Sequence, residues 1–367
     1  MLPAIFGAAF GATIYIGADG KFYNAVSGGS EVSYTTGDAF NFQTGVTSWN
    51  IAQNISGGGG IYVNTKTIAI DGAYTAALGG ITTGGTTATG PAISLLNGAS
   101  MTLGYVNASS NTFKSVSLQG TSSAQTTLTL TGYLTTSYLS IESLSVGEYS
   151  TLNVANAFIV PTSMTVSAHA TVNIGCLQIT GGTFTSNADT GSITVTNSSI
   201  NMMAGSKLVL NTSNAIKLSG AGKSQADLIL AVARNTATLE LGADQAFNKL
   251  SFSFGGSVPS VQMTIDTNGY ALDFTSTTSS FTTTKTALTV LIEDFTDGKV
   301  HFGTMLDTNE DGTVKYIYAV IDAVQTQLYQ RENGYLYTTV PEPAEWAAIF
   351  GALALGLAIY RRRGNRQ

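Results

Sequence analysis

Two nine-residue segments carry the pattern that decides the predicted fold: Val146-Gly-Glu-Tyr-Ser-Thr-Leu-Asn-Val and Val166-Ser-Ala-His-Ala-Thr-Val-Asn-Ile. Each has a turn of small residues, then a serine or alanine, then a strand with apolar residues at alternate positions. Asn97-Gly-Ala-Ser-Met-Thr-Leu and Met203-Ala-Gly-Ser-Lys-Leu-Val-Leu repeat the pattern more loosely. The pattern predicts a stack of short strands that are joined by tight turns.

The spacing of these segments favours a solenoid. Equivalent positions are Ser100, Ser150, Ala170 and Ser206, at intervals of 50, 20 and 36 residues. One rung of a parallel β-helix takes roughly 20 residues or slightly more. The first two intervals therefore fit two rungs and one rung, whereas 36 does not fit unless a loop is inserted. We expect an all-β, right-handed parallel β-helix over residues 13–285, with a pair of β-sandwiches as the alternative.

Composition agrees with a β-rich, weakly charged chain. Charged residues make up 10% of the 367 residues, and 41 residues are glycine. A typical soluble domain has about 25% charged residues. Few amphipathic helices can be written with so little Glu, Lys and Arg, while glycine, serine, threonine and asparagine suit turns and exposed strand positions. The net charge of −6 argues against a nucleic-acid partner, since such partners require basic patches.

The pattern changes after Lys285. Segments such as Thr289-Val-Leu-Ile-Glu-Asp-Phe are longer, more aromatic and more charged than those before. Three of the turns between them have explicit turn sequences, Thr296-Asp-Gly, Glu310-Asp-Gly and Glu332-Asn-Gly. We expect residues 286–339 to form an antiparallel β cap, because an open solenoid end exposes unpaired strand edges.

The C-terminal region 340–367 has the features of a membrane segment. An apolar run from Trp346 to Tyr360 precedes the basic tail 361–366, which holds Arg361, Arg362 and Arg363. A helix over 346–360 would be roughly 22 Å long, shorter than the roughly 30 Å hydrocarbon core. The arginines predict a cytoplasmic tail and place the preceding chain on the other side of the membrane.

The order of these parts resembles the PEP-CTERM sorting signal of bacteria. The motif is Pro341-Glu342-Pro343, and the short apolar segment and the arginines follow it at the chain end. The resemblance covers about 27 of 367 residues. It implies export, a C-terminal tail that initially lies in the inner membrane, and processing by an exosortase-like membrane protease. The processed chain would then reach the cell surface or the extracellular matrix.

The N-terminal segment 1–12 is an incomplete export signal. An apolar stretch runs from Ile5 to Ala12, but Lys21 is the first cation, so no basic residue precedes it. Two interpretations stay open, a weak signal peptide and a true start upstream of Met1.

One short segment has a partial metal-binding pattern. Asp307, Asn309 and Asp311 match the first oxygen ligands of a calcium loop, and Gly312 stands where the loop turns. Tyr318 occupies the twelfth position, which should hold a bidentate carboxylate. We therefore favour a polar hairpin turn, with no cofactor, and keep calcium as the alternative.

Other candidate groups are interpreted as structural. Cys176, the single cysteine, is expected to be a small buried hydrophobe, and His169 and His301 are expected to be ordinary strand residues. Gly222-Lys223-Ser224 lacks the preceding glycine of a phosphate-binding loop. No catalytic or cofactor-binding residue is predicted.

The sequence thus predicts a non-enzymatic, exported surface or matrix protein, structural or adhesin-like, with extracellular polysaccharide as a candidate partner. Its repeats resemble the passenger regions of autotransporter-like surface proteins. The alternative is a surface-anchored polysaccharide lyase or glycosidase on the same fold. Such an enzyme needs clustered carboxylates or basic groups, and between Gly72 and Glu142 the only charged residue is Lys114.

Overall fold

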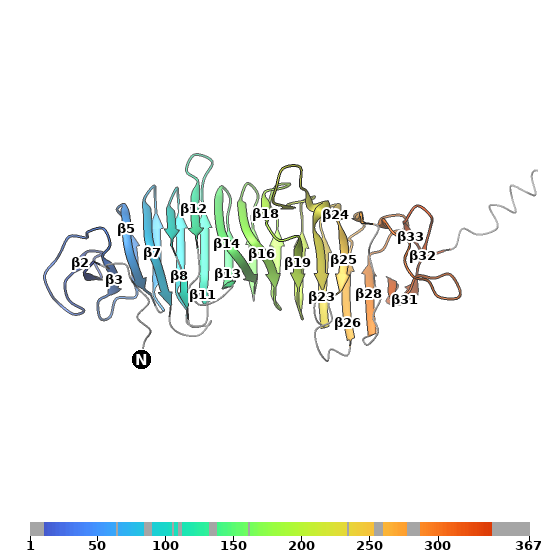
Figure 1. Cartoon of the computed structure of the whole chain (residues 1–367), viewed down its shortest axis with the longest axis horizontal. Helices are drawn as coiled ribbons and strands as arrows, with labels where there is room; N and C mark the ends of the chain where they lie inside the picture. Colours follow the sequence, from blue (N-terminus) through green and yellow to red (C-terminus); the bar gives the residue numbers. More distant parts are fainter. Residues whose placement is uncertain are drawn as a thin grey trace, which may run out of the picture.

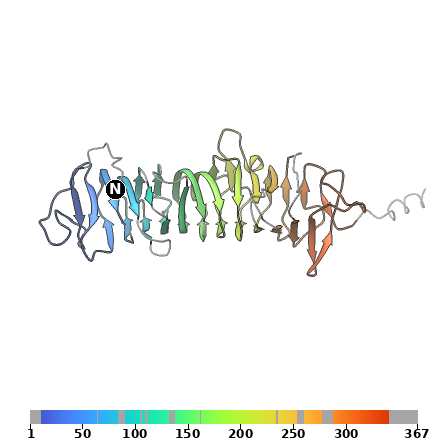
Figure 2. The same ribbon diagram turned by 60° about the horizontal axis from the view of Figure 1, so that its bottom comes forward.

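The computed structural model is an elongated rod of short strands that follow one another in chain order along the long axis (Figure 1). It describes residues 11–63, 65–83, 90–104, 106–108, 112–131, 138–160, 162–232, 235–252, 260–276 and 287–339. Figure 2 shows the rod turned about its axis, with the last strands at one end. Neighbouring rungs pair almost entirely in parallel, which confirms the all-β solenoid and contradicts the β-sandwich alternative.

Each rung contributes strands to three faces, which we name A, B and C. Face A contains β4 Ser48–Ile51, β6 Thr67–Asp71, β8 Ala92–Leu96, β11 Thr112–Gln119, β13 Tyr138–Val146, β15 Ser163–Val166, β17 Thr183–Ser186, β20 Ser206–Leu210, β23 Asn235–Leu241, β26 Ser260–Asp266, β28 Ala287–Glu293 and β30 Ile317–Ile321. This face is one unbroken parallel ladder along the rod.

Face B follows face A after a turn in each rung. It contains the first part of β7 Thr75–Thr83, β9 Ser100–Leu103, β12 Thr126–Leu130, the first parts of β14 Ser150–Val160 and β16 Thr171–Ile179, then β18 Ile193–Val195 and β21 Ile216–Leu218. A separate parallel sheet of β24 Gln245–Phe247, β27 Leu272–Phe274 and β29 Val300–Phe302 takes this place in the last rungs.

Face C completes the rung. It contains β1 Thr13–Ile16, β3 Ala39–Phe42, the last part of β5 Ile55–Tyr62 and of β7, β10 Val106–Ala108, the first part of β13, the last parts of β14 and β16, then β19 Ser199–Met202, β22 Ile229–Val232 and β25 Lys249–Phe252. The 3₁₀ turn η2 Gln225–Asp227 precedes β22.

The core is a set of columns of inward side chains. On face A successive register partners are Trp49, Ile68, Ile93, Val116, Leu144, Met164, Phe184, Leu208, Leu239, Ile265 and Ile292. None of these side chains is more than 2% exposed. Because parallel pairing fixes which residues stand above one another, each rung buries its apolar positions against the next.

Two ladders of small polar residues cover the outer side of face A. Ser115, Ser143, Ser163 and Thr183 stand in register on successive strands. A second ladder two positions along the same strands is Ser94, Ser117, Ser145, Thr165 and Thr185. Alternation along a strand places these residues outside whenever their neighbours point inward.

The interval of 36 residues to Ser206 has a structural explanation. Ser100 and Ser150 begin the face B strands β9 and β14, and Ala170 directly precedes β16, whereas Ser206 begins β20 on face A. The fourth segment therefore belongs to a different face and is not an equivalent position one rung further on. The strand pattern was correctly predicted there, but its place in the rung was wrong.

The predicted antiparallel cap begins later than residue 286. β28 and β30 pair in parallel with their face A neighbours, and β29 pairs in parallel with β27. Antiparallel pairing occurs between β30 and β31 Val324–Gln327 and between β32 Tyr329–Gln330 and β33 Leu336–Tyr337. The longer, more aromatic strands thus continue the solenoid, because their alternating apolar positions still fill its interior.

The first end of the rod also has an antiparallel strand, β2 Phe22–Tyr23, paired with β1. Residues 1–10, the Pro341-Glu342-Pro343 motif, the predicted span 346–360 and the arginine tail lie outside the described residues. Within the part of the chain that is described, no helix is long and apolar enough to cross a membrane.

Candidate functional site

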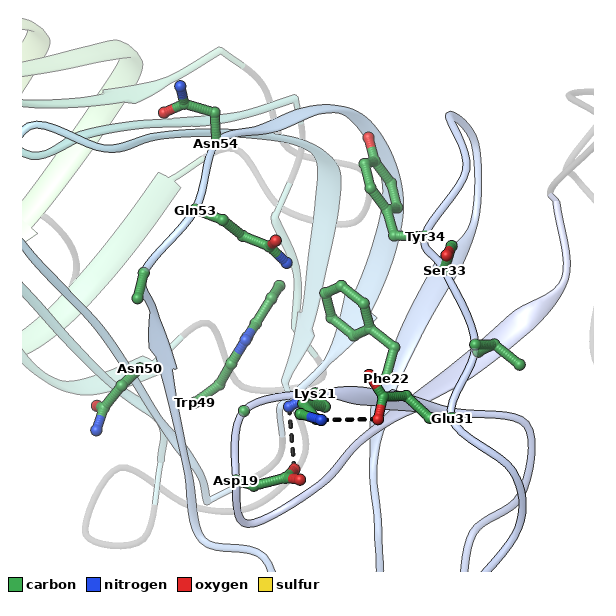
Figure 3. Close-up of a pocket in the computed structure, with 13 residues that line it drawn as sticks. Asp19, Lys21, Phe22, Glu31, Ser33, Tyr34, Trp49, Asn50, Gln53 and Asn54 are labelled. Atoms are coloured by element: carbon green, nitrogen blue, oxygen red, sulfur yellow. Dashed lines mark hydrogen bonds and ion pairs between the residues drawn. The ribbon is translucent and has the colours of Figure 1, made fainter.

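A pocket of about 490 Å³ lies at the N-terminal end of the rod (Figure 3). We name it the terminal pocket. One wall comes from the β1–β2 hairpin and the segment after it, within Asp19–Phe22 and Glu31–Tyr34. The other wall comes from β4 and the turn that follows it, within Trp49–Asn54. The pocket therefore joins the end of face A to the hairpin that closes face C.

The rings of Phe22, Tyr34 and Trp49 line its floor, and the core residue Phe40 packs against them. The ring centroids of Phe40 and Trp49 are 5.2 Å apart, and Tyr34 lies 5.6 Å from Phe40. Phe22 contacts all three rings, with centroid distances from 5.6 to 6.2 Å. Trp49 is only 2% exposed and the Tyr34 hydroxyl donates a hydrogen bond to the Ser56 carbonyl, so the floor is fixed by packing.

Charged groups occupy the rim in fixed pairs. Lys21 Nζ lies 2.8 Å from Glu31 Oε2, and both side chains are more than half exposed. The Tyr23 hydroxyl donates a 2.7 Å hydrogen bond to Asp19 Oδ2, and the Lys21 backbone N–H donates to Asp19 Oδ1 at 3.1 Å. These interactions hold the hairpin in one shape above the floor.

The same contacts shift proton affinities. The Tyr23 hydrogen bond, and then the Lys21 N–H, lower the pKa of the Asp19 carboxyl below its usual value. The Glu31 carboxylate raises the pKa of Lys21 through its hydrogen bond and charge. Asp19 is therefore ionised at neutral pH and is a poor proton donor, so it favours binding over general-acid chemistry.

The pocket contains one edge of a β-sheet. Within the described chain, β4 pairs with β6 and with no second strand. Thr67 N–H donates to the Thr47 carbonyl at 3.0 Å, so the backbone groups of Thr47 and Trp49 face β6. The backbone N–H and C=O groups of Ser48 and Asn50 therefore face away from β6, on the side of the strand where the pocket lies.

A second hollow, of about 330 Å³, lies where faces B and C meet in the middle of the rod. We name it the amide groove. Asn173 Nδ2 donates to Asn153 Oδ1 at 2.9 Å, and Asn153 Nδ2 donates to Thr129 Oγ1 at 3.2 Å. Its other polar lining residues are Thr131, Thr194, which is the register partner of Asn173, and then Thr196 and Ser219. All of the residues that line this groove are uncharged.

The partial calcium pattern forms a hydrogen-bonded turn. Asp311 Oδ1 accepts from the backbone N–H and from the hydroxyl of Thr313, at 3.0 and 2.6 Å. Asn309 Nδ2 donates to the same hydroxyl at 3.0 Å, and the Asp307 carbonyl accepts from Lys315 N–H. In the part of the chain that is described, no group of three or more His, Cys, Asp or Glu residues could hold a metal ion.

The two histidines occupy different kinds of position. His301 lies in β29 as predicted, with Nδ1 at 2.5 Å from Asp273 Oδ1 on the neighbouring strand. His169 is in a turn with φ of 57°, so its prediction as a strand residue was wrong. Its ring stacks on Tyr149 at 5.0 Å and its Nδ1 lies 3.0 Å from Asp189. Both histidines therefore connect successive rungs.

Cys176 and Ser224 also have structural partners. Cys176 is half-buried, and its Sγ accepts from Asn197 and Asn201 at 3.5 Å each, while burial raises the pKa of the thiol. Asp227 Oδ2 accepts from Ser224 N–H at 2.8 Å. The Asp227 carboxylate therefore accepts the backbone N–H that a phosphate would accept in a phosphate-binding loop.

Sequence reasoning missed the terminal pocket. Its residues come from segments up to 35 residues apart in an ordinary-looking stretch, with no recognisable motif. The available signal was the density of Phe, Tyr and Trp between Phe22 and Trp49. Comparisons with protein-family models, with curated proteins and with solved structures gave no match.

Proposed function

We propose that the protein is an exported structural or adhesin-like component of the cell surface or extracellular matrix. In this proposal the rod has the structural or adhesive role, and the C-terminal PEP-CTERM-like signal directs the protein to the cell surface. The observation that carries this proposal is the pair of hydroxyl ladders on the outer side of face A, from β8 to β17. There, serine and threonine stand in register on strand after strand.

Such a surface suits neutral, hydroxyl-rich partners. The hydroxyls repeat at about 4.8 Å between strands, the spacing of paired backbones. Ser163 Oγ lies 3.4 Å from Ser143 Oγ, which shows how closely the ladder members approach. Hydrogen bonds to many weak, identical sites favour an extended polysaccharide over a compact charged ligand. The amide groove adds carbonyl and N–H groups of the same uncharged kind.

The solenoid is proposed to be right-handed, as nearly all parallel crossover connections are. The apolar segment 346–360 is proposed to span the inner membrane before an exosortase-like protease cuts near Pro341-Glu342-Pro343. Arg361, Arg362 and Arg363 would hold the tail on the cytoplasmic side.

The alternative is a carbohydrate-active enzyme, and one observation favours it. Asp19, Lys21 and Glu31 converge on the terminal pocket, which is the kind of charged cluster that such an enzyme needs. The lowered pKa of the Asp19 carboxyl leaves it poorly suited to donate a proton at neutral pH. A Glu31→Gln variant that loses measurable polysaccharide cleavage would establish the enzyme; absence of new reducing ends with the wild-type protein would favour the rod.

Cell fractionation tests the sorting part of the proposal. The full chain is compared with a chain truncated after Thr339, which keeps every described residue, and with an Arg361→Ala variant. The full chain is expected in the outer-surface fraction, and the truncated chain is expected in a different fraction. Identical distribution of the full and truncated chains would contradict the sorting role.

Adhesion is tested by pull-down with insoluble neutral polysaccharides such as cellulose or chitin. Ser143→Glu and Ser163→Glu place negative charges on the hydroxyl ladder and are expected to reduce retention. Glu148→Gln changes charge in a turn beside the same rung and serves as the control. Equal retention of all the variants would contradict adhesion through face A.

A further inference from the structure

The two ends of face A both present an unpaired strand edge in the part of the chain that is described. At the first end the edge is β4, where the backbone groups of Ser48 and Asn50 face away from β6 and Asn50 lines the terminal pocket. At the last end β31 pairs with β30 and with no further strand. Natural proteins usually protect exposed edges with charge, proline or a covering segment.

The geometry of β31 defines which groups it offers. Asp322 and Ala323 form the two-residue turn between β30 and β31, and both have positive φ, 50° and 63°. In such a hairpin the flanking pair, Ile321 and Val324, exchanges hydrogen bonds. The pairs alternate along the ladder, so the backbone groups of Gln325 and Gln327 point outward.

The edges match in length and charge. Each presents two residues, separated by one, whose N–H and C=O groups point outward: Ser48 and Asn50 on β4, Gln325 and Gln327 on β31. All four side chains are uncharged and exposed. No like charges therefore oppose one another when the two strands pair.

The hairpin also carries two exposed apolar side chains, which flank its turn. Val324 is 62% exposed and Ile321 is 39% exposed, which makes Val324 the most exposed of the large hydrophobic residues described. The terminal pocket has an aromatic floor that includes Tyr34, which is partly exposed. These exposed apolar side chains at one end of the rod and the aromatic hollow at the other end are complementary.

We propose that the protein assembles head to tail, with the β30–β31 hairpin of one copy entering the terminal pocket of the next copy. β31 then pairs with β4 of the next copy. Since β4 and β30 run in parallel along face A, and β31 runs opposite to β30, this pairing is antiparallel. Asn50 stands opposite Gln325, and Ser48 stands opposite Gln327.

The contact joins two different surfaces of the same chain. Each copy keeps a free pocket at one end and a free hairpin at the other, so the contact is heterologous and forms an open filament. Face A would then continue from copy to copy along the filament. The inference goes beyond the proposed function and does not rest on it, because assembly requires neither export nor polysaccharide.

Disulfide trapping with mixed variants tests the pairing directly. Asn50→Cys and Gln325→Cys are made separately in full-length Cys176→Ser protein, kept in mild detergent, mixed and oxidised. Opposed residues on paired strands lie about 5.5 Å apart, within reach of a disulfide. The mixture is expected to yield disulfide-linked dimers, and the double variant Asn50→Cys/Gln325→Cys is expected to yield a ladder of longer species.

The control replaces Gln325→Cys with Thr165→Cys, an exposed position on face A far from either end. Equal dimer yield with this control would overturn the proposal, because random collision would then explain the product. Dimers of Asn50→Cys alone at the yield of the mixture would also overturn it, since they indicate a contact between two identical ends. Absence of dimers in the mixture would overturn it too.

Sedimentation velocity supplies a test without cysteine. The weight-average sedimentation coefficient of the wild type is expected to rise with protein concentration. Val324→Lys is expected to remove this rise, whereas Val26→Lys, at an exposed valine that lines neither edge, is expected to keep it. A wild type that stays monomeric, or a Val324→Lys variant that still assembles, would contradict the proposal.

Discussion

Asn173 donates a 2.9 Å hydrogen bond from Nδ2 to Oδ1 of Asn153, which lies 20 residues earlier in the chain. The two residues are direct register partners on β16 and β14. Asn153 in turn donates to Thr129, 24 residues earlier, on β12. Side-chain amides therefore repeat, on the outside of face B, the rung-to-rung hydrogen bonds that the backbone makes inside each ladder.

Replacing Asn173 by aspartate should weaken this ladder. Aspartate keeps the size of the side chain, but it lacks the N–H donor and places a carboxylate against Asn153 Oδ1. We expect a loss of about 0.5–1.5 kcal/mol in the free energy of unfolding, measured by urea denaturation. Thr194→Ala, one strand further on the same ladder, is the control. Equal losses of unfolding free energy in the two variants would show that the Asn153–Asn173 hydrogen bond does not stabilise the fold.

Phe184 tests the inward column of face A. Its side chain is fully buried between Met164 and Leu208. Phe184→Ala should cost about 3–5 kcal/mol, because it leaves a cavity between two rungs. Thr185→Ala, the next residue and on the outer side, should stay within about 0.5 kcal/mol of the wild type. Similar losses at the two positions, in the same urea series, would argue against this register.

Gly334 and Gly312 form a matched pair of turn glycines. Both have positive φ, 85° and 81°. A Cβ at Gly334 would meet the Phe302 carbonyl and the His301 ring, whereas nothing lies near a Cβ at Gly312. Gly312→Ala should cost about 1 kcal/mol from backbone strain alone. Gly334→Ala should lower the thermal unfolding midpoint more than Gly312→Ala does. A larger decrease for Gly312→Ala would show that Gly334 does not pack against His301 and Phe302 of β29.

Asp19 links the terminal pocket to pH. Because its pKa is lowered in the folded protein, it contributes stability above the ordinary aspartate pKa of about 3.9 and loses it as the pH falls through the folded value. Tyr23→Phe removes the principal donor and should raise the Asp19 titration midpoint, observed by carboxyl carbon NMR. Lys21→Ala leaves the Tyr23 hydroxyl in place and should therefore raise the Asp19 titration midpoint less. An unchanged midpoint in Tyr23→Phe would exclude the hydrogen bond as the cause.

The sequence predicted the class of fold because period-two alternation and small-residue turns are local properties. Leu152 and Val172 were correctly expected to be equivalent inward positions, and they are register partners. The local pattern is the same in face A strands and face B strands, so Ser206 was wrongly treated as equivalent to Ser150. The antiparallel cap was placed too early for the same reason, since Val290 and Ile317 follow the same alternation as a hairpin strand would.

Two features had no local signal. The tight turn at Asp322-Ala323 contains no glycine, although both residues have positive φ, so glycine-based turn rules did not find it. The terminal pocket depends on the hairpin at Asp19 folding back over Trp49, which only the three-dimensional structure shows. The C-terminal motif was readable because its parts are contiguous and ordered along the chain.

Intact-mass analysis of the protein recovered from the cell surface tests the central claim most directly. The sorting proposal predicts a chain that ends near Pro341-Glu342-Pro343 and lacks residues 346–367, with a Pro341→Ala/Pro343→Ala variant retained uncut in the membrane fraction. Recovery from the surface of a chain that still ends at Gln367, or recovery of the wild type from the cell interior alone, would contradict it.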